Sequence, residues 1–273
     1  MKTVSARGVK IPALGFGTFE LSSRVAEDRV CAALETGYRH VDTAQMYGNE
    51  KAVGRGIRKS GIAREEVWVT TKVWPDRFRD GDLQASVRES LDRLDMKSVD
   101  LLLLHWPNPE VELAETLEAL NQVHEEGMAT HIGISNFTTD LIHRANELSR
   151  ARLLLNQVEY HPYLDQSRVR AELDQHHMAL TAYCPIAHGK VLGDATLNEI
   201  GKRHGKNEIQ VTLRWLIQQE GVIAIPRSSR EEHLRANFDI WDFELSDEDM
   251  RRIHDLARPD GRIISPSFAP DWD

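Results

Sequence analysis

The sequence has little cysteine and no long apolar run. Its two cysteines, Cys31 and Cys184, are too few for a disulfide framework, so we expect reduced thiols and a cytoplasmic protein. No stretch approaches the length of a membrane-spanning helix, and residues 1–5 lack the apolar core of a secretory signal. These shortages argue against a disulfide-stapled secreted domain and against a membrane protein.

Positive charge is also in short supply. The chain has 34 lysines and arginines against 43 aspartates and glutamates, a net charge of -9. An acidic surface repels nucleic acid and anionic membranes, so we expect neither as a partner. A small anionic ligand would need a local basic pocket.

Two kinds of ligand motif are missing. No Gly-x-Gly-x-x-Gly follows a strand, because the glycine pairs in 15–17 and 54–56 have no third glycine, and 189–190 lacks the rest of a phosphate-binding loop. A Rossmann domain is therefore not expected. His124, His131, His176 and His177 have neither zinc-motif spacing nor cysteine companions, which favours surface histidines over metal ligands.

What the sequence does contain is a regular alternation of strand-like and helical patterns. The strand-like segments are 14–17, 40–42, 67–72, 100–105, 131–135, 154–159, 180–183 and 222–225. The helical segments are 24–36, 83–94, 113–126, 140–148, 167–176, 208–219 and 231–238. Eight strands separated by helices favour an α/β fold of the (β/α)8 TIM-barrel type.

We expect one domain spanning residues 1–273, because no linker or internal repeat divides the 273 residues. Residues 4–11 read as a short hairpin before the barrel. The tail at 259–273 is rich in proline and glycine and predicts a loop folded over one barrel end. Phe268 and Trp272 in that tail are expected to contact the pocket.

Four chemically active side chains stand at or just beyond strand ends: Asp42, Tyr47, Lys72 and His105. The carboxyl ends of barrel strands share one rim, so these residues are expected to meet. A tyrosine with a free pKa of ~10 is a usable acid, and a neighbouring ammonium favours its ionised form. We therefore predict that Tyr47 donates a proton and that Lys72 lowers its pKa.

The remaining two side chains have supporting roles in this interpretation. Asp42 would keep Lys72 charged, and His105 would orient a carbonyl oxygen. Taken singly, each residue is more often structural, and a histidine followed by Trp106 and a proline could simply be buried. Together they predict an enzyme that reduces a carbonyl group.

A candidate anion site follows the strand at 222–225. Arg227, Ser228, Ser229 and Arg230 precede the helix at 231–238, whose first N–H groups favour a phosphate. The alternative is an ordinary serine cap with exposed arginines. Strand-end side chains Ser135, Asn136 and Gln157 could bond a carboxamide, and Tyr183 offers a flat face to a ring.

These stretches resemble the aldo-keto reductase family over nearly the whole chain. The matching segments are 15–18, 42–50, 71–72, 104–107, 133–137, 156–157 and 225–226 with the loop after it. The resemblance implies a barrel that binds extended NADPH, with Tyr47 as proton donor. The cofactor-binding positions it implies are Thr18, Asp42, Ser135, Asn136, Gln157, Tyr183, Pro185, Ile186, Ile225, Arg227, Ser228, Ser229, His233 and Asn237. The substrate-binding positions it implies are Phe19, Tyr47, Trp74, His105 and Trp106.

Within that family, the short loops and the ending at 262–273 are similar to bacterial 2,5-diketo-D-gluconate reductases of the B type. This implies reduction of 2,5-diketo-D-gluconate, methylglyoxal or similar small carbonyls. A barrel of this type does not require a partner subunit, so we expect a monomer. Where many relatives carry an arginine for the adenosine 2′-phosphate, this chain has His233, and Ala236 replaces a frequent glutamate. Histidine is mostly neutral near pH 7, so we expect NADPH to be favoured over NADH by a reduced margin.

Two other functions remain open at this point. Lys72 could act as the nucleophile of a Schiff-base lyase, since such enzymes also use a barrel-strand lysine. The chain could also be an NADPH-binding subunit without catalysis.

Overall fold

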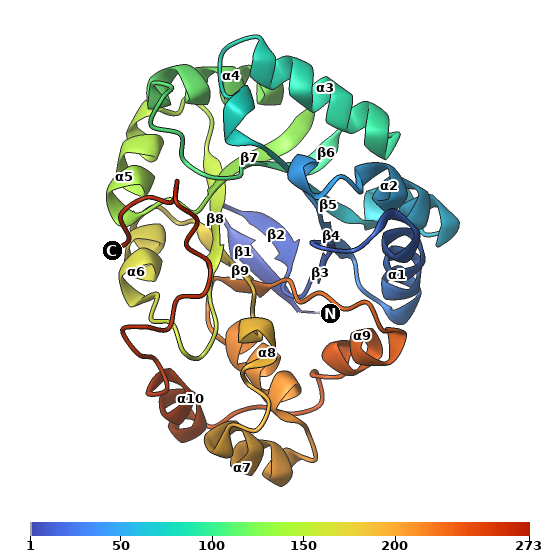
Figure 1. The fold of residues 1–273 in the computed structure, drawn as a ribbon, viewed down its shortest axis with the longest axis vertical. Helices are drawn as coiled ribbons and strands as arrows, with labels where there is room; N and C mark the ends of the chain where they lie inside the picture. The colour runs from blue at the N-terminus through green and yellow to red at the C-terminus, as the bar shows by residue number, and fades with distance from the viewer. Residues whose placement is uncertain (1) are drawn as a thin grey trace.

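Eight parallel strands form the centre of the computed structural model, which describes residues 2–273 (Figure 1). They are β3 (Phe16–Gly17), β4 (His40–Asp42), β5 (Trp68–Val73), β6 (Val99–Leu104), β7 (Ala129–Ser135), β8 (Leu153–Glu159), β9 (Ala179–Tyr183) and β10 (Val222–Ala224). Each strand pairs with its neighbours in chain order. Their side chains are almost entirely buried, as expected when helices cover the outside.

The sheet closes on itself between its first and last strands. Leu14 bridges Ala224 in parallel, and the Gly15 N–H donates to the Ala224 carbonyl at 2.8 Å. Gly17 lies so close to the segment after β10 that a Cβ there would stand 2.8 Å from the Ile225 carbonyl oxygen. Glycine at this position therefore allows the two ends of the sheet to meet, and the predicted (β/α)8 barrel is confirmed.

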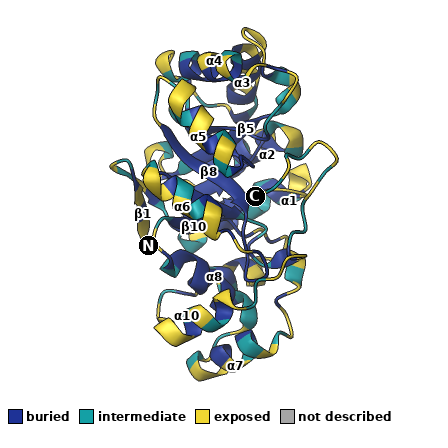
Figure 2. Cartoon of the chain, turned by 90° about the vertical axis from the view of Figure 1, so that its left-hand side faces the viewer, coloured by how far each residue is buried: buried dark blue, intermediate teal, exposed yellow. Residues whose placement is uncertain are grey.

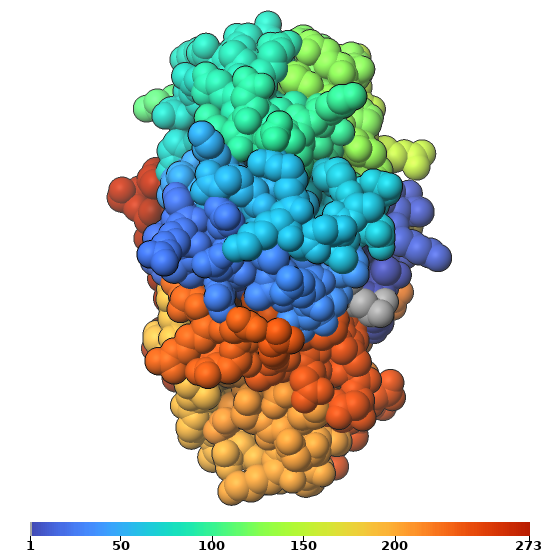
Figure 3. Space-filling view, turned by 90° about the vertical axis from the view of Figure 1, so that its right-hand side faces the viewer, coloured from blue at the N-terminus to red at the C-terminus, as the bar shows by residue number. Residues whose placement is uncertain are grey.

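Helices surround the strands and turn their exposed faces outward (Figure 2). They are α1 (Ser23–Thr36), α2 (Glu50–Lys59), α3 (Asp82–Leu94), α4 (Leu113–Glu125), α5 (Thr139–Leu148), α6 (Ser167–Gln175), α7 (Ala195–His204), α8 (Glu208–Gln218), α9 (Glu231–Phe238) and α10 (Asp247–His254). Figure 3 shows the orange segment that contains α9 beside the blue segment that contains α1. The Tyr38 hydroxyl links these distant parts by donating to the Leu234 carbonyl at 3.1 Å.

The two ends of the barrel are covered differently. The antiparallel hairpin of β1 (Thr3–Ala6) and β2 (Val9–Pro12) lies across the end where the strands begin, with Ile11 fully buried (Figure 1). Residues 259–273 contain no helix or strand and pass over the end where the strands finish. The hairpin and the tail loop were both predicted, and both are confirmed.

All of the predicted helices are present within two residues of their expected ends. The structure adds α2, α7 and α10, which the sequence patterns did not predict. Within residues 2–273, every helix is too short or too polar to cross a bilayer.

Candidate active site

Four side chains meet at the carboxyl ends of three adjacent strands. Asp42 is the last residue of β4, Lys72 lies near the end of β5, and His105 directly follows β6. Tyr47 comes from the short 3-10 turn Gln45–Tyr47, which leads away from β4. The fold thus assembles the quartet from residues far apart in sequence, because parallel strands present their carboxyl ends on one rim.

Lys72 is the centre of the hydrogen-bond network. Its fully buried ammonium donates to Asp42 Oδ1 at 2.5 Å, to the Thr43 carbonyl at 3.0 Å and to the Tyr47 hydroxyl oxygen at 3.1 Å. These three bonds use all three N–H groups of the ammonium. Because the Tyr47 oxygen accepts from Lys72, its own hydrogen is left free to be donated to another group.

The pKa of Tyr47 beside Lys72 differs from the sequence prediction. Burial raises the pKa of the Tyr47 phenol above its usual value, although Lys72 opposes this rise. The predicted net lowering is therefore wrong, since the loss of water around the phenol outweighs the nearby ammonium. Burial alone would lower the pKa of Lys72, but the Asp42 carboxylate overcomes it and raises that pKa. At neutral pH the phenol is protonated and the amine is charged.

His105 adds a neutral imidazole to the same cavity. Burial, followed by the charge of Lys72, holds its pKa well below the usual value. Its Nδ1 has no hydrogen-bond partner anywhere in residues 2–273. The ring centroid lies 5.8 Å from that of Tyr47 and 5.1 Å from that of Trp74. A neutral ring beside the phenol is able to hydrogen-bond an uncharged carbonyl oxygen.

Asp42 is fixed from both sides. Its second carboxylate oxygen accepts a hydrogen bond from Gln157 Nε2 at 2.8 Å. Its backbone carbonyl accepts one from the Thr18 hydroxyl at 3.0 Å. The carboxylate that holds Lys72 is therefore itself held by residues after β3 and in β8.

A second network of polar side chains lies beside the quartet. The Tyr183 hydroxyl donates to Asn136 Oδ1 at 2.7 Å, and Asn136 Nδ2 donates to the His105 carbonyl at 2.9 Å. The Ser135 hydroxyl donates to the Gln157 carbonyl at 2.8 Å. Asn136 has a φ of 62°, the left-handed region that non-glycine residues seldom occupy. Buried amides and strained backbone of this kind often mark a binding site.

The candidate phosphate loop lies between β10 and α9. Arg227 donates to Glu20 at 2.6 Å and to the Phe19 carbonyl at 3.1 Å. Arg230 and His233 are exposed, and each lies beside Glu232, at 3.5 Å and 3.8 Å. The basic groups expected to bind phosphate therefore all have carboxylate neighbours.

The other predicted cofactor positions lie after strands β9 and β10 and in helix α9. Pro185 and Ile186 follow β9, Ile225 follows β10, and Asn237 is buried in α9. Ser228 is buried with its hydroxyl bonded to the backbone of Arg230, while Ser229 is exposed.

Aromatic rings surround the quartet. The Phe19 ring lies 5.0 Å from that of Tyr47. Phe268 of the tail packs edge-on against Trp74 at 5.8 Å and Trp106 at 5.6 Å. Trp272, also from the tail, stands 6.0 Å from Trp106. The predicted contact between tail and pocket is present, and it adds Phe268 and Trp272 to the walls.

A buried carboxylate holds this tail in place. Glu159, at the end of β8, accepts the Ile263 and Ile264 backbone N–H groups, each at 2.7 Å. His161 contacts the same carboxylate at 2.8 Å, and both side chains are fully buried. The sequence does not predict this role of Glu159, and its only sign there is an acidic residue at the end of an apolar strand.

The chain is similar to known proteins over nearly its whole length. The profile of the Aldo/keto reductase family matches residues 13–258. Methylglyoxal reductase DkgB of Escherichia coli O157:H7 is 41% identical over 267 residues, covering 96% of this chain and 99% of the relative.

Two crystal structures extend the likeness to the whole fold. One, provisionally named 2,5-diketo-D-gluconic acid reductase B, is 51% identical with a TM-score of 0.98, covering 100% of this chain and 98% of the other. A Bombyx mori aldo-keto reductase in complex with NADP is 30% identical with a TM-score of 0.91. The match covers 99% of this chain and 97% of the other.

Proposed function

The chain belongs to the aldo/keto reductase family and is an oxidoreductase, and from that premise we propose that it reduces small aldehydes and ketones to alcohols with NADPH. The observation that carries this proposal is the Lys72–Tyr47 hydrogen bond, in which the phenol oxygen accepts and its hydrogen stays available. A protonated phenol next to a neutral imidazole suits the reduction of a carbonyl, whose oxygen needs a proton as it gains negative charge.

The residues present fit a nicotinamide cofactor. Ser135, Asn136 and Gln157 gather hydroxyl and amide groups at adjacent strand ends, which suits a carboxamide. Tyr183 is only partly buried and offers a ring face beside them. Arg227 and the first N–H groups of α9 would meet the phosphates. When bound, NADPH supplies the hydride that reduces the carbonyl carbon.

The chain's own residues would control the proton. His105 would hydrogen-bond the carbonyl oxygen and align it with the Tyr47 hydroxyl. As negative charge grows on that oxygen, Tyr47 would release its proton to it. The ammonium of Lys72 would stabilise the resulting phenolate, and Asp42 would keep Lys72 charged. The raised pKa of Tyr47 keeps its hydroxyl protonated at neutral pH before the reaction.

We propose methylglyoxal and 2,5-diketo-D-gluconate as the substrates to examine first. Relatives named for each of these compounds are 41% and 51% identical to the chain. The walls of Phe19, Trp74, Trp106 and the tail rings would favour a compact carbonyl over a long one.

A lyase that forms a Schiff base on Lys72 is disfavoured by the geometry. An amine must lose its charge to attack a carbonyl, and Lys72 has a raised pKa and three hydrogen bonds. Borohydride treatment in the presence of substrate is expected to leave Lys72 unlabelled, and labelling there would revive the lyase.

Steady-state kinetics test the proposal. NADPH oxidation should depend on added methylglyoxal or diketogluconate, with a higher kcat/KM for NADPH than for NADH. If NADPH binds but no carbonyl in a broad panel accelerates its oxidation, the chain is a binding subunit rather than a reductase. Equal or better efficiency with NADH would reject the cofactor preference alone.

We also propose that residues 1–273 act as one monomeric domain in the cytoplasm. Free Cys31 and Cys184 support a reducing compartment.

A further inference from the structure

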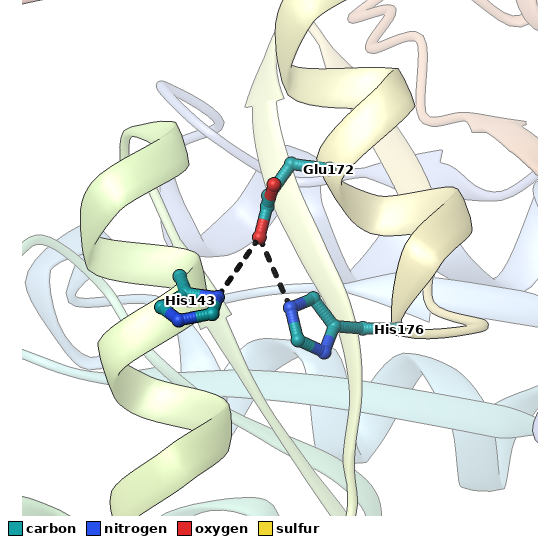
Figure 4. A group of neighbouring side chains, drawn as sticks. All are labelled: His143, Glu172 and His176. Atoms are coloured by element: carbon teal, nitrogen blue, oxygen red, sulfur yellow. Dashed lines mark hydrogen bonds and ion pairs between the residues drawn. The ribbon is translucent and has the colours of Figure 1, made fainter.

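Three side chains with metal-binding atoms converge on the outer surface of the barrel, away from the rim described above (Figure 4). They are His143 of α5, and Glu172 and His176 from α6 and its end. Within residues 2–273 this is the one group of three or more histidine, cysteine or acidic residues close enough to share an ion. Neither the reaction nor the cofactor accounts for it.

The distances between these donor atoms are close to those around a metal ion. Glu172 Oε1 lies 3.0 Å from His176 Nε2 and 3.6 Å from His143 Nδ1, and all the donor atoms lie within 4.8 Å of one another. Donors bound at ~2.1 Å to a tetrahedral ion are roughly 3.4 Å apart. The distances from Glu172 to His176 and to His143 lie on either side of this value. Rotation of the exposed His143 ring would adjust the third distance, between the two imidazole nitrogens.

Helices α5 and α6 fix the positions of the three donor side chains relative to one another. Glu172 and His176 are four residues apart, so they share one face of α6. Arg7 of the hairpin fixes the end of that helix by donating to the His176 carbonyl at 3.0 Å. The same guanidinium donates to Asn146 Oδ1 at 2.8 Å, on α5. Arg7 is thereby bonded to neutral oxygens, and no ion pair ties it to Glu172.

A second carboxylate stands behind the site. His143 Nε2, the nitrogen that points away from Glu172, lies 3.3 Å from Glu147 on the same helix. Metal-bound histidines commonly donate their other nitrogen to such a carboxylate, which orients the ring and strengthens it as a ligand. The other oxygen of Glu172 faces the Gln175 amide at 3.5 Å.

We propose that His143, Glu172 and His176 bind a divalent transition-metal ion of the Zn²⁺ type. Two imidazoles and one carboxylate are a donor set that suits Zn²⁺, and also Cu²⁺ and Ni²⁺, better than Mg²⁺ or Ca²⁺. Water would complete the coordination at this exposed position. This proposal differs from the expectation from the sequence, which favoured His176 as a surface histidine over a metal ligand. The second imidazole, His143, lies on another helix, so no sequence spacing connects it to His176.

The ion would tie α5 to α6. The first residue of α5, Thr139, bonds Asp273 through its backbone N–H at 3.1 Å and its hydroxyl at 2.6 Å. The bound ion would thus stabilise α5, the helix whose Thr139 bonds the last residue of the tail. Binding to the folded chain alone raises thermal stability, so occupancy should be visible in the unfolding temperature.

Calorimetric titration of the tag-free, chelator-treated full-length protein with ZnCl2 tests this proposal. We expect one Zn²⁺ per chain and a rise in Tm on its addition. His143→Ala removes an exposed ligand without disturbing the core, and it should weaken binding at least tenfold and abolish the Tm rise. His204→Ala, which removes a histidine of α7, is the matched control and should bind like the wild type.

Two results would overturn the site. One is the absence of saturable Zn²⁺ binding by the wild type. The other is wild-type affinity in the His143→Ala protein, which would place the ion on scattered histidines or on cysteine. His176→Ala provides the second variant, and circular dichroism confirms that each protein is folded.

Discussion

Single residues decide the chemistry here through the number of hydrogen bonds each can make. Lys72 gives its three N–H groups to Asp42, Thr43 and Tyr47 and has none left for a substrate. Tyr47 receives one of them and keeps its own hydrogen. In the proposed reaction the ammonium that hydrogen-bonds the phenol would have no free N–H and no free lone pair with which to attack a substrate, which argues for the reductase over the lyase.

Replacing Lys72 by methionine should reduce kcat by roughly 10²-fold or more. The variant removes the charge that opposes the rise in the Tyr47 pKa, so that pKa should move higher. Because the donor is active when protonated, the fall in activity at high pH should also move upward. Measured pH–rate profiles identical in shape to the wild type would reject this role. Lys59→Met, which removes an exposed lysine, is the control.

His233 lies near the start of α9, at the position where the resemblance places the adenosine 2′-phosphate. It is exposed and lies beside Glu232. His233→Arg would add a guanidinium able to bond a phosphate with two N–H groups, so KM for NADPH should fall about fivefold while KM for NADH stays unchanged. An equal change for both cofactors would show that position 233 does not meet the 2′-phosphate.

At the scale of elements, strand ends were predictable and some helices were not. Hydrophobic runs located the eight strands, and with them the positions of Asp42, Lys72 and His105. Helix α2 contains Gly54 and Gly56, which weaken a helix and obscure its pattern. The structure explains both, since a Cβ on Gly54 would lie 2.1 Å from the Leu94 carbonyl oxygen and one on Gly56 2.6 Å from that of Glu27.

Other features of the site depend on contacts that no local pattern contains. The net pKa direction of Tyr47 depends on how much protein surrounds the phenol, so spacing alone gave the wrong sign. The hydrogen bonds from the tail backbone to the Glu159 carboxylate join residues about a hundred positions apart. His143 and His176 are likewise brought together only by the packing of α5 on α6.

The position of residues 259–273 over the barrel end depends on the buried carboxylate of Glu159. Glu159→Gln would place an amide N–H₂ against one of the two backbone N–H groups that the carboxylate now accepts, so the tail should loosen. Loss of about 1–2 kcal/mol of local ordering should raise KM for carbonyl substrates roughly tenfold, while the Kd for NADPH stays the same. Titration of cofactor fluorescence beside steady-state kinetics separates the two. A matching rise in Kd would instead indicate damage to the whole rim.

For the whole molecule, buried neutral histidines make stability depend on pH. Burial lowers the pKa of His40 to about 4, despite the opposing charge of Asp42. The unfolded chain therefore binds more protons between the two pKa values, and stability falls as the pH is lowered from about 6.5 towards 4. His105 acts in the same direction.

Urea unfolding should accordingly give a free energy of unfolding about 2 kcal/mol lower at pH 5 than at pH 8 from His40 alone. His40→Gln should reduce that difference, since the amide does not titrate. An unchanged pH dependence in this variant would assign the acid sensitivity to other groups.

The most direct test of the account concerns the proton donor. Tyr47→Phe removes one hydroxyl and keeps the ring that packs against Phe19 and His105. We predict that its kcat for methylglyoxal falls by about 10³-fold or more while the Kd for NADPH stays within twofold of the wild type. A kcat close to the wild-type value with cofactor binding intact would contradict the assignment of Tyr47 and the reaction built on it.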